Sequence, residues 1–298
     1  MKAIHDFATI SEWNAFNNHE TLHPLVSVMD FSKAGKRRGY RANFGLYCIT
    51  LKAVKCGDLG YGRGSYDYQE GTLVFFSPGQ VIDVTNKTEA YQPLGHGLAF
   101  HPDLLLGTPL AQKMHEYHFF SYQANEALHL SESEKRLVLD CFSKTEQELR
   151  HPIDKHSKQL IVSNIELLLN YCERFYDRQF ITRENINKGI LERFEGLLND
   201  YFVSDKPEEM GLPSVAYFAD ELHLSPNYFG DLIKKETGRS AQEYIQHKII
   251  DIAKSRLFDD RSTINEIAYQ LGFKYPQHFI RLFKKQIGQT PHAYRNAN

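Results

Sequence analysis

Hydrophobic residues follow two different patterns along the chain. Between about residues 21 and 100 they form short runs rich in Val, Ile, Tyr and Phe and broken by glycine. Such runs predict strands of a compact barrel or sandwich. The clearest runs are at residues 25–29, 44–51, 73–76 and 97–100. From Ser131 onward apolar residues recur at helical spacing, so the predicted fold class is α+β.

The helical part begins with two long amphipathic segments within residues 131–176. Ser131 and Glu134 form a capping box, and the helix after it places Leu137, Cys141 and Leu149 on one side. A second helix is predicted over residues 155–176, with five apolar residues on one stripe. They are Ile161, Ile165, Leu168, Cys172 and Phe175. This stripe suits either a core that covers the strands or a dimer surface.

A polar segment at residues 177–184 is predicted to join two domains, residues 1–185 and 186–298. After another amphipathic helix at 187–202, the chain contains an internal repeat. Residues 226–245 align with 276–295 at an offset of 50, which pairs Phe229 with Phe279 and Gly238 with Gly288. Upstream the offset is 49, so the turn of the later copy has gained one residue. An internal repeat is strong evidence of architecture.

Each copy has the pattern of a helix, a tight turn and a second helix. In the later copy Thr263 and Glu266 form a capping box, Gly272 supplies the turn and Pro276 suits the first position of the next helix. Gly288 ends that helix. Between the copies a long helix is predicted over residues 240–258, with a capping box of its own and an apolar side. Its apolar side comprises Tyr244, Ile249, Ile252, Ala253 and Leu257.

The second helix of each copy carries the candidate DNA-binding residues. In the later copy they are Gln277, His278, Arg281, Lys284 and Lys285, and in the earlier copy Asn227, Tyr228, Asp231, Lys234 and Lys235. No carboxylate occurs between residues 274 and 285. Amide and guanidinium groups read base edges in the major groove, whereas ammonium groups hold phosphates. The pattern therefore predicts two recognition helices, at residues 226–235 and 276–285.

Residues 212–295 resemble the AraC/XylS-type transcription regulators. The resemblance rests on Gly272-Phe273, Phe279, Phe283-Lys284-Lys285, Gly288, Thr290-Pro291 and Tyr294-Arg295. It implies a sequence-specific transcription factor with two helix-turn-helix motifs that enter successive major grooves of double-stranded DNA. It also implies a homodimer, RNA polymerase as a partner and a small-molecule effector of unknown identity.

The resemblance assigns roles to particular residues. Gln277 and Arg281 match positions that read bases, while Lys234, Lys284 and Lys285 suit phosphates. The earlier copy departs from the family pattern, because Gly230 and Asp231 stand where related proteins often have Gln or Arg. Asp231 either accepts a hydrogen bond from cytosine N4 or has no DNA role. Asn227 or Tyr228 then carries the specificity of that helix.

The N-terminal half resembles a cupin barrel at residues 71–79. Metal-dependent cupin enzymes need two histidines and a glutamate on one strand and a later histidine. The matching positions here are residues 56–65 and Val81 or Ile82, and none is a histidine. His115 and His118 have a spacing that suits one helical face but lack a third ligand. The chain is therefore expected to be no enzyme and to need no metal or cofactor, although a metal-independent cupin-type binding protein or enzyme with an accessory DNA-binding domain is the alternative.

Composition adds a location and a charge asymmetry. The chain has 298 residues and a net charge of −2, but residues 213–298 hold 12 Lys and Arg against 9 Asp and Glu and carry +3. A nucleoid-type protein would need a larger basic excess. Four cysteines without CxxC spacing predict reduced thiols in the cytoplasm. The first residues lack the pattern of a signal peptide, and no apolar run is long enough to suggest a membrane span.

Overall fold

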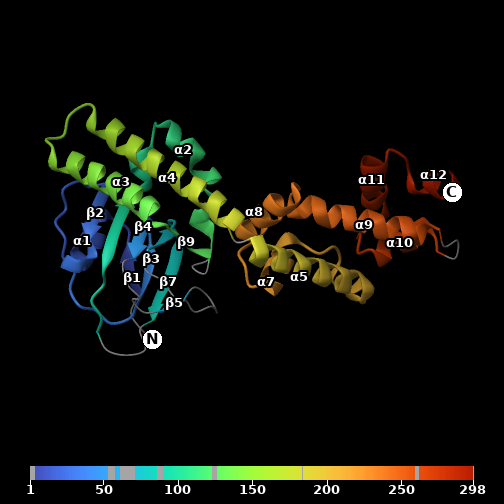
Figure 1. Cartoon of the computed structure of the whole chain (residues 1–298). Coiled ribbons are helices and arrows are strands. Elements are labelled where there is room, and N and C mark those ends of the chain that lie inside the picture. Colours follow the sequence, from blue (N-terminus) through green and yellow to red (C-terminus); the bar gives the residue numbers. More distant parts are fainter. Residues whose placement is uncertain are drawn as a thin grey trace. The chain divides into compact units, whose positions relative to one another are not determined.

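The computed structural model describes residues 4–52, 58–60, 71–85, 90–122, 126–182, 184–258 and 262–297. The chain forms two compact units, Met1–Thr182 and Arg183–Asn298. In the described residues, strands occur only in the first unit, and every element of the second unit is a helix (Figure 1). The predicted α+β class is confirmed.

The strands of the first unit form two sheets. They are β1 (Ile4–Phe7), β2 (Val26–Asp30), β3 (Tyr40–Phe44), β4 (Tyr47–Lys52), β5 (Asp58–Gly60), β6 (Thr72–Phe76), β7 (Gln80–Thr85), β8 (Gly95–Phe100) and β9 (Leu128–His129). One sheet has the order β1-β3-β7-β5 and the other β2-β8-β4-β6-β9. Across the described residues these sheets stay separate and open, so the predicted cupin-like barrel is not confirmed.

The hydrophobic run at residues 44–51 belongs to two strands, not one. β3 ends at Phe44 and β4 begins at Tyr47, with Gly45 and Leu46 between them. The backbone N–H of Gly45 donates to the carbonyl of Phe7 at 2.9 Å. A Cβ at Gly45 would lie 3.1 Å from the Cα of Ala8. The small residue therefore lets the β3–β4 turn lie against the chain that follows β1.

One buried cluster takes side chains from both sheets and from α1 (Ile10–Phe16). Trp13 of α1 contacts Phe7 and Phe44 edge-on, at centroid distances of 5.1 and 5.4 Å. Val74 of the other sheet belongs to the same cluster. Such aromatic pairs add about 0.5–1.5 kcal/mol each beyond the area that they bury. Residues 4–20, for which the sequence predicted no element, thus supply a strand, a helix and part of the core.

Short helices connect β8 to β9, and two long helices follow them. The connecting helices are η2 (Pro102–Leu105), α2 (Pro109–Lys113), η3 (Met114–Glu116) and η4 (His118–Ser121). α3 (Glu132–Arg150) and α4 (Ser157–Thr182) pack side by side (Figure 1). The predicted capping box of Ser131 and Glu134 is confirmed. Leu137, predicted on the apolar side, is 38% exposed instead, and Val138 is fully buried.

The polar segment at residues 177–184 belongs to α4 as far as Thr182, and the division between the two units also falls within it, after Thr182. Its polar side chains bind the strand edge beside them. Arg178 donates to the carboxylate of Glu134 at 2.7 Å and to the carbonyl of His129 at 2.6 Å. Gln179, 2% exposed, accepts from the backbone N–H of His129 at 2.8 Å. The polar residues of this segment therefore hydrogen-bond α4 to strand β9.

The second unit begins with α5 and contains both copies of the repeat. Its helices are α5 (Glu184–Val203), α6 (Lys206–Met210), α7 (Val215–Glu221), α8 (Pro226–Thr237), α9 (Ala241–Leu257), α10 (Ile264–Gln270), α11 (Pro276–Ile287) and α12 (Pro291–Ala297). In the first copy Phe194 of α5 contacts Phe218 of α7 and Phe229 of α8, at centroid distances of 5.2 and 5.0 Å. These three rings hold α7 and α8 onto α5.

The long helix α9 lies between the two copies. The predicted capping box of Ser240 and Glu243 is confirmed. The helix has 17 residues, which gives a length of about 25 Å. The hydroxyl of Tyr244 donates to the carboxylate of Glu195 on α5. Burial and this carboxylate raise the pKa of Tyr244 to about 12. Ile252, predicted to be buried, is only half-buried.

The second copy has an aromatic core of its own. Phe283 of α11 contacts Phe279 at 5.8 Å and Tyr294 of α12 at 5.4 Å. The Arg295 guanidinium donates to the carbonyl of Leu257 at 3.0 Å. Because that carbonyl is at the end of α9, the bond ties α12 to the long helix.

Candidate nucleic-acid interface

The first helix-turn-helix consists of α7 and α8. Ser225, 3% exposed, caps α8 by accepting from the backbone N–H of Tyr228 at 3.2 Å. His223 in the turn has a φ of 58°, in the left-handed region. Gly238 ends the helix with a φ of 72°, and its N–H donates to the carbonyl of Lys234 at 2.9 Å. The start and the end of α8 are therefore set by local capping residues.

The second helix-turn-helix consists of α10 and α11. The predicted capping box of Thr263 and Glu266 is confirmed. Gly272 has a φ of 90°, as a turn glycine should. A Cβ at this position would lie 2.6 Å from the carbonyl carbon of Gly211, so the turn packs closely on the loop after α6. Gly288 takes a φ of 84° and caps α11, as predicted.

The outer face of α11 carries all five residues predicted for it. Gln277, His278, Arg281, Lys284 and Lys285 are exposed. The opposite face holds Phe279 and Phe283, both fully buried. Residues three and four apart share a helix face, so these polar and cationic groups form one surface. The helix can therefore present an amide, an imidazole, a guanidinium and two ammonium groups to a single partner.

The outer face of α8 carries fewer of its predicted residues. Asn227, Lys234 and Lys235 are exposed and Asp231 is half-buried. Tyr228, predicted to contribute to base reading, is only 4% exposed. The expectation that Tyr228 lies on the outer face is wrong, because the first turn of α8 packs its ring into the core of the unit.

A groove between α9 and α11 brings three of the predicted residues together with two that the sequence missed. His278, Arg281 and Lys285 line it from α11, and Gln242 and Gln246 line it from α9. The groove has a volume of about 330 Å³ and an apolar floor. Gln242 lies in the first turn of α9 and Gln246 four residues later, and this helical spacing was the only signal in the sequence. The groove adds amide groups to the cationic surface of α11.

Residues 218–297 match the family model of a helix-turn-helix domain. The C-terminal unit contains an AraC-type helix-turn-helix domain. The uncharacterised HTH-type transcriptional regulator YtdP of Bacillus subtilis (strain 168) is 43% identical over 77 residues, which are 26% of this chain and 10% of YtdP. YobQ of the same organism, which has the same description, is 24% identical over 238 residues, 78% of this chain and 83% of YobQ.

A solved structure similar to this helix-turn-helix domain is the C-terminal domain of the two-component response regulator yesN from Fusobacterium nucleatum. The match is 28% identical, covers 35% of this chain and 95% of that chain, and has a TM-score of 0.31. The function that the family model and the relatives support is DNA-binding transcription regulation. None of the described helices is long and apolar enough to cross a membrane.

The helix-turn-helix domain has a further surface at the start of α11. Tyr275 precedes the helix and is 52% exposed. Its ring lies 5.6 Å from that of His278, and the Lys274 ammonium lies 5.7 Å from its centre. The sequence reasoning did not single out Lys274 or Tyr275. An exposed aromatic ring next to a lysine at the start of a recognition helix was the missed signal.

The histidines outside the helix-turn-helix domain form no metal site among the residues described. His115 lies in η3 and His118 in η4. Tyr117 between them has a ψ of 75°, which interrupts the helix. The two histidines therefore do not lie on one continuous helix, although their spacing is compatible with one helical face.

The cupin positions can be compared only in part. The segment at residues 56–65 lies largely outside the described residues, since only 58–60 within it are described. The later position falls on β7, where Val81 is 43% exposed and Ile82 is 2% exposed. Neither side chain has a group that could bind a metal.

Proposed function

We propose that the chain is a sequence-specific transcription factor whose helices α8 and α11 enter successive major grooves of an operator. Successive grooves on one face of DNA are about 34 Å apart. The observation that supports this most directly is the outer face of α11, which is exposed, polar and cationic and has no carboxylate. Such a helix, in a domain that matches a helix-turn-helix family model, suits DNA, because its cations can meet phosphates and its polar groups can reach base edges.

The two ends of α11 are proposed to do different work. Gln277 and Arg281 lie four residues apart on the first turns, where an amide and a guanidinium can reach base edges. Lys284 and Lys285 lie in the last turn. Flexible ammonium groups there suit phosphates better than bases. In α8, Asn227 is the exposed candidate for base contact.

Binding-site selection with the full chain tests this function. We expect one preferred sequence that spans two major grooves, bound at least about a thousandfold more tightly than random DNA at physiological salt. Binding that depends on salt but not on sequence would contradict the proposal. The −2 net charge of the chain leaves little room for tight binding through phosphates alone.

We further propose that the first unit responds to a small molecule and joins two chains, so that the bound dimer acts on RNA polymerase in the cytoplasm.

The proposed dimer surface is on α4. Leu160 and Leu167 of this helix are 49% and 41% exposed and lie seven residues apart on one face. The double change Leu160→Glu and Leu167→Glu should give a monomer in sedimentation. Ile153→Glu, which changes a 71% exposed residue between α3 and α4, should remain dimeric.

A further inference from the structure

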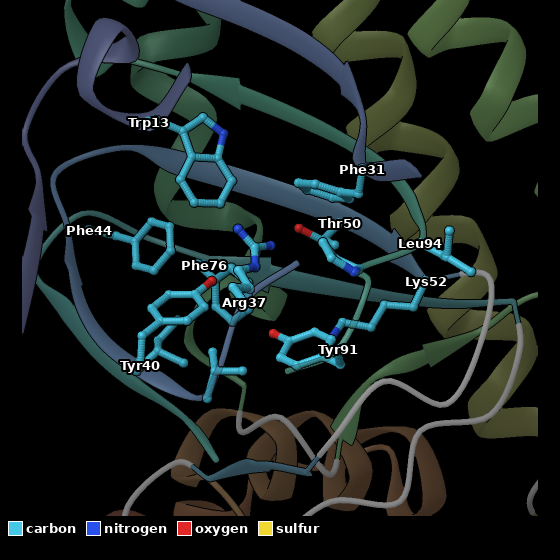
Figure 2. A pocket seen from close by; sticks show the side chains of 13 residues that line it. Trp13, Phe31, Arg37, Tyr40, Phe44, Thr50, Lys52, Phe76, Tyr91 and Leu94 are labelled. Atoms are coloured by element: carbon cyan, nitrogen blue, oxygen red, sulfur yellow. The ribbon is translucent and has the colours of Figure 1, made fainter. Parts of the chain in front are cut away.

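A small cavity lies inside the first unit, with aromatic walls (Figure 2). Six aromatic rings line it, four of them without a hydroxyl group. Those four are Trp13, Phe31, Phe44 and Phe76. Its volume is about 50 Å³. A dry cavity that holds benzene has about 150 Å³, so this one suits a ligand of only a few carbon atoms.

The Arg37 side chain occupies the middle of this ring of aromatic groups in Figure 2. Its guanidinium lies 5.0 Å from the centre of the Phe16 ring and 5.3 Å from that of Tyr40. One terminal nitrogen donates to the side-chain oxygen of Asn17 at 2.7 Å. The backbone of Arg37 pairs with that of Tyr91 in both directions, at 3.0 and 2.9 Å. The position of the guanidinium is therefore fixed in advance of any ligand.

The Nε of Arg37 is buried and has no hydrogen-bond partner in the described part of the chain. Buried donors are nearly always satisfied, because leaving one without a partner is costly. No carboxylate occurs among the described residues that line the cavity, whereas a second cation, Lys52, also lines it. The cavity thus has apolar walls and a cationic group, Arg37, whose Nε lacks a partner among the described residues.

The remaining polar groups are neutral hydroxyls. Thr50, 9% exposed, and Tyr91 line the cavity with Tyr40. Burial raises the pKa of Tyr40 to about 12, so its hydroxyl stays protonated and can donate at neutral pH. A sugar would need several paired donors and acceptors, and a phosphate dianion would lose its hydration against aromatic rings. A single carboxylate needs fewer hydrogen-bonding groups than a sugar and gives up less hydration than a phosphate dianion.

We propose that this cavity binds a short aliphatic monocarboxylate, with its carboxylate on Arg37 and its carbon chain against the aromatic walls. Arginine pairs with carboxylates through two parallel hydrogen bonds, and Nε can supply one of them. The inference rests on the proposed function, because it names the chemical class of the effector to which the first unit would respond. It concerns the first unit alone and can fail while DNA binding stands.

Calorimetry on the full chain tests the proposal with sodium acetate, propionate, butyrate and hexanoate. We expect one of these to bind, and its neutral amide to bind at least about tenfold more weakly, because a charge-assisted hydrogen bond is lost. Arg37→Gln should weaken binding by a similar factor. Arg38→Gln is the matched control, since Arg38 is exposed and does not line the cavity.

Three outcomes would overturn the proposal. They are no binding by any of the four acids, equal binding of an acid and its amide, and tighter binding of inorganic phosphate than of the acids. The comparison of acid with amide uses the unchanged chain, so it holds even if Arg37→Gln does not fold. Operator binding measured on the same preparation separates the two hypotheses, because intact operator binding without acid binding contradicts only the ligand inference.

Discussion

The two proposed recognition helices, α8 and α11, have the same length and the same kind of C-terminal cap but different surfaces. α8 and α11 both have 12 residues, begin with proline and end at a left-handed glycine. Arg281 of α11 is exposed, whereas Asp231 stands at the same place in α8 and is half-buried. α8 buries its Tyr228, whereas α11 exposes His278. Shared capping and core residues therefore preserve the helix, and the outer positions are free to differ in what they bind.

The turns that precede these helices also differ. His223 takes a φ of 58° in the first copy, and Gly272 takes 90° in the second. The second is pressed against another backbone segment, at Gly211. A side chain is tolerated in one turn and excluded from the other. The repeat thus conserves the conformation of the turn while the packing around it decides which residue is allowed.

The largest expected effect comes from breaking this turn. Gly272→Ala should lower the free energy of unfolding of the second unit by about 2–5 kcal/mol, because alanine is strained at this φ and its Cβ would clash with backbone. His223→Ala should cost less than about 1 kcal/mol, since a side chain is already accommodated there. Denaturant unfolding followed by circular dichroism measures both. Equal losses would mean that the two turns are packed alike.

The next largest effect is expected at the position where the outer faces of α8 and α11 differ most, Asp231 in α8 and Arg281 in α11. Arg281→Ala should weaken binding to the selected operator by about 1–3 kcal/mol, relax preference at one base pair and leave random DNA almost unaffected. Asp231→Ala should change operator binding by less than about 0.5 kcal/mol. Fluorescence anisotropy with the operator and with random DNA measures the loss of affinity in each variant. A loss at Asp231 as large as that at Arg281 would show that α8 reads bases through its carboxylate.

The helical part of the fold could be predicted because its signals are local. Capping boxes at Ser131, Ser240 and Thr263 begin helices where the sequence predicted them, and Gly238 and Gly288 end two others. Each signal depends on residues within one turn of helix. The positions of the candidate DNA-binding residues on α11 followed from the same periodicity.

The first unit was harder because its signals are not local. β1 pairs in parallel with β3, about 37 residues later, and three of its four side chains are exposed, so no hydrophobic pattern marks it. Arg178 and Gln179 extend α4 beyond its predicted end at residue 176, because both side chains bond to His129, about 50 residues away. Tyr228 shows the same limit in the second unit. Which side of a short helix is buried depends on its neighbours.

A smaller effect is expected where the two helices agree. Lys234 and Lys284 are both exposed and lie in the last turns of α8 and α11. Replacing either by alanine should weaken operator and random DNA alike, and each should reduce the slope of log affinity against log salt by about 0.9. Titrations at four salt concentrations measure the slope. If only Lys284→Ala changes the slope, Lys234 of α8 does not contact a phosphate. The two helices would then share their length and C-terminal caps but not their phosphate contacts.

The smallest effect concerns Gly230, which stands in α8 where α11 has Ile280. A Cβ added there meets no atom within 4 Å, and the position is inside a regular helix. Gly230→Ala should therefore stabilise the second unit by about 0.5–1 kcal/mol, since alanine favours the helix and restricts the unfolded chain. Thermal unfolding measures the gain, and operator binding by the same variant shows whether it is free of cost. Unchanged affinity would mean that α8 tolerates a larger residue on its outer face, as α11 does. A stabilised variant with weaker operator binding would instead show that the backbone of α8 must approach the DNA more closely than that of α11.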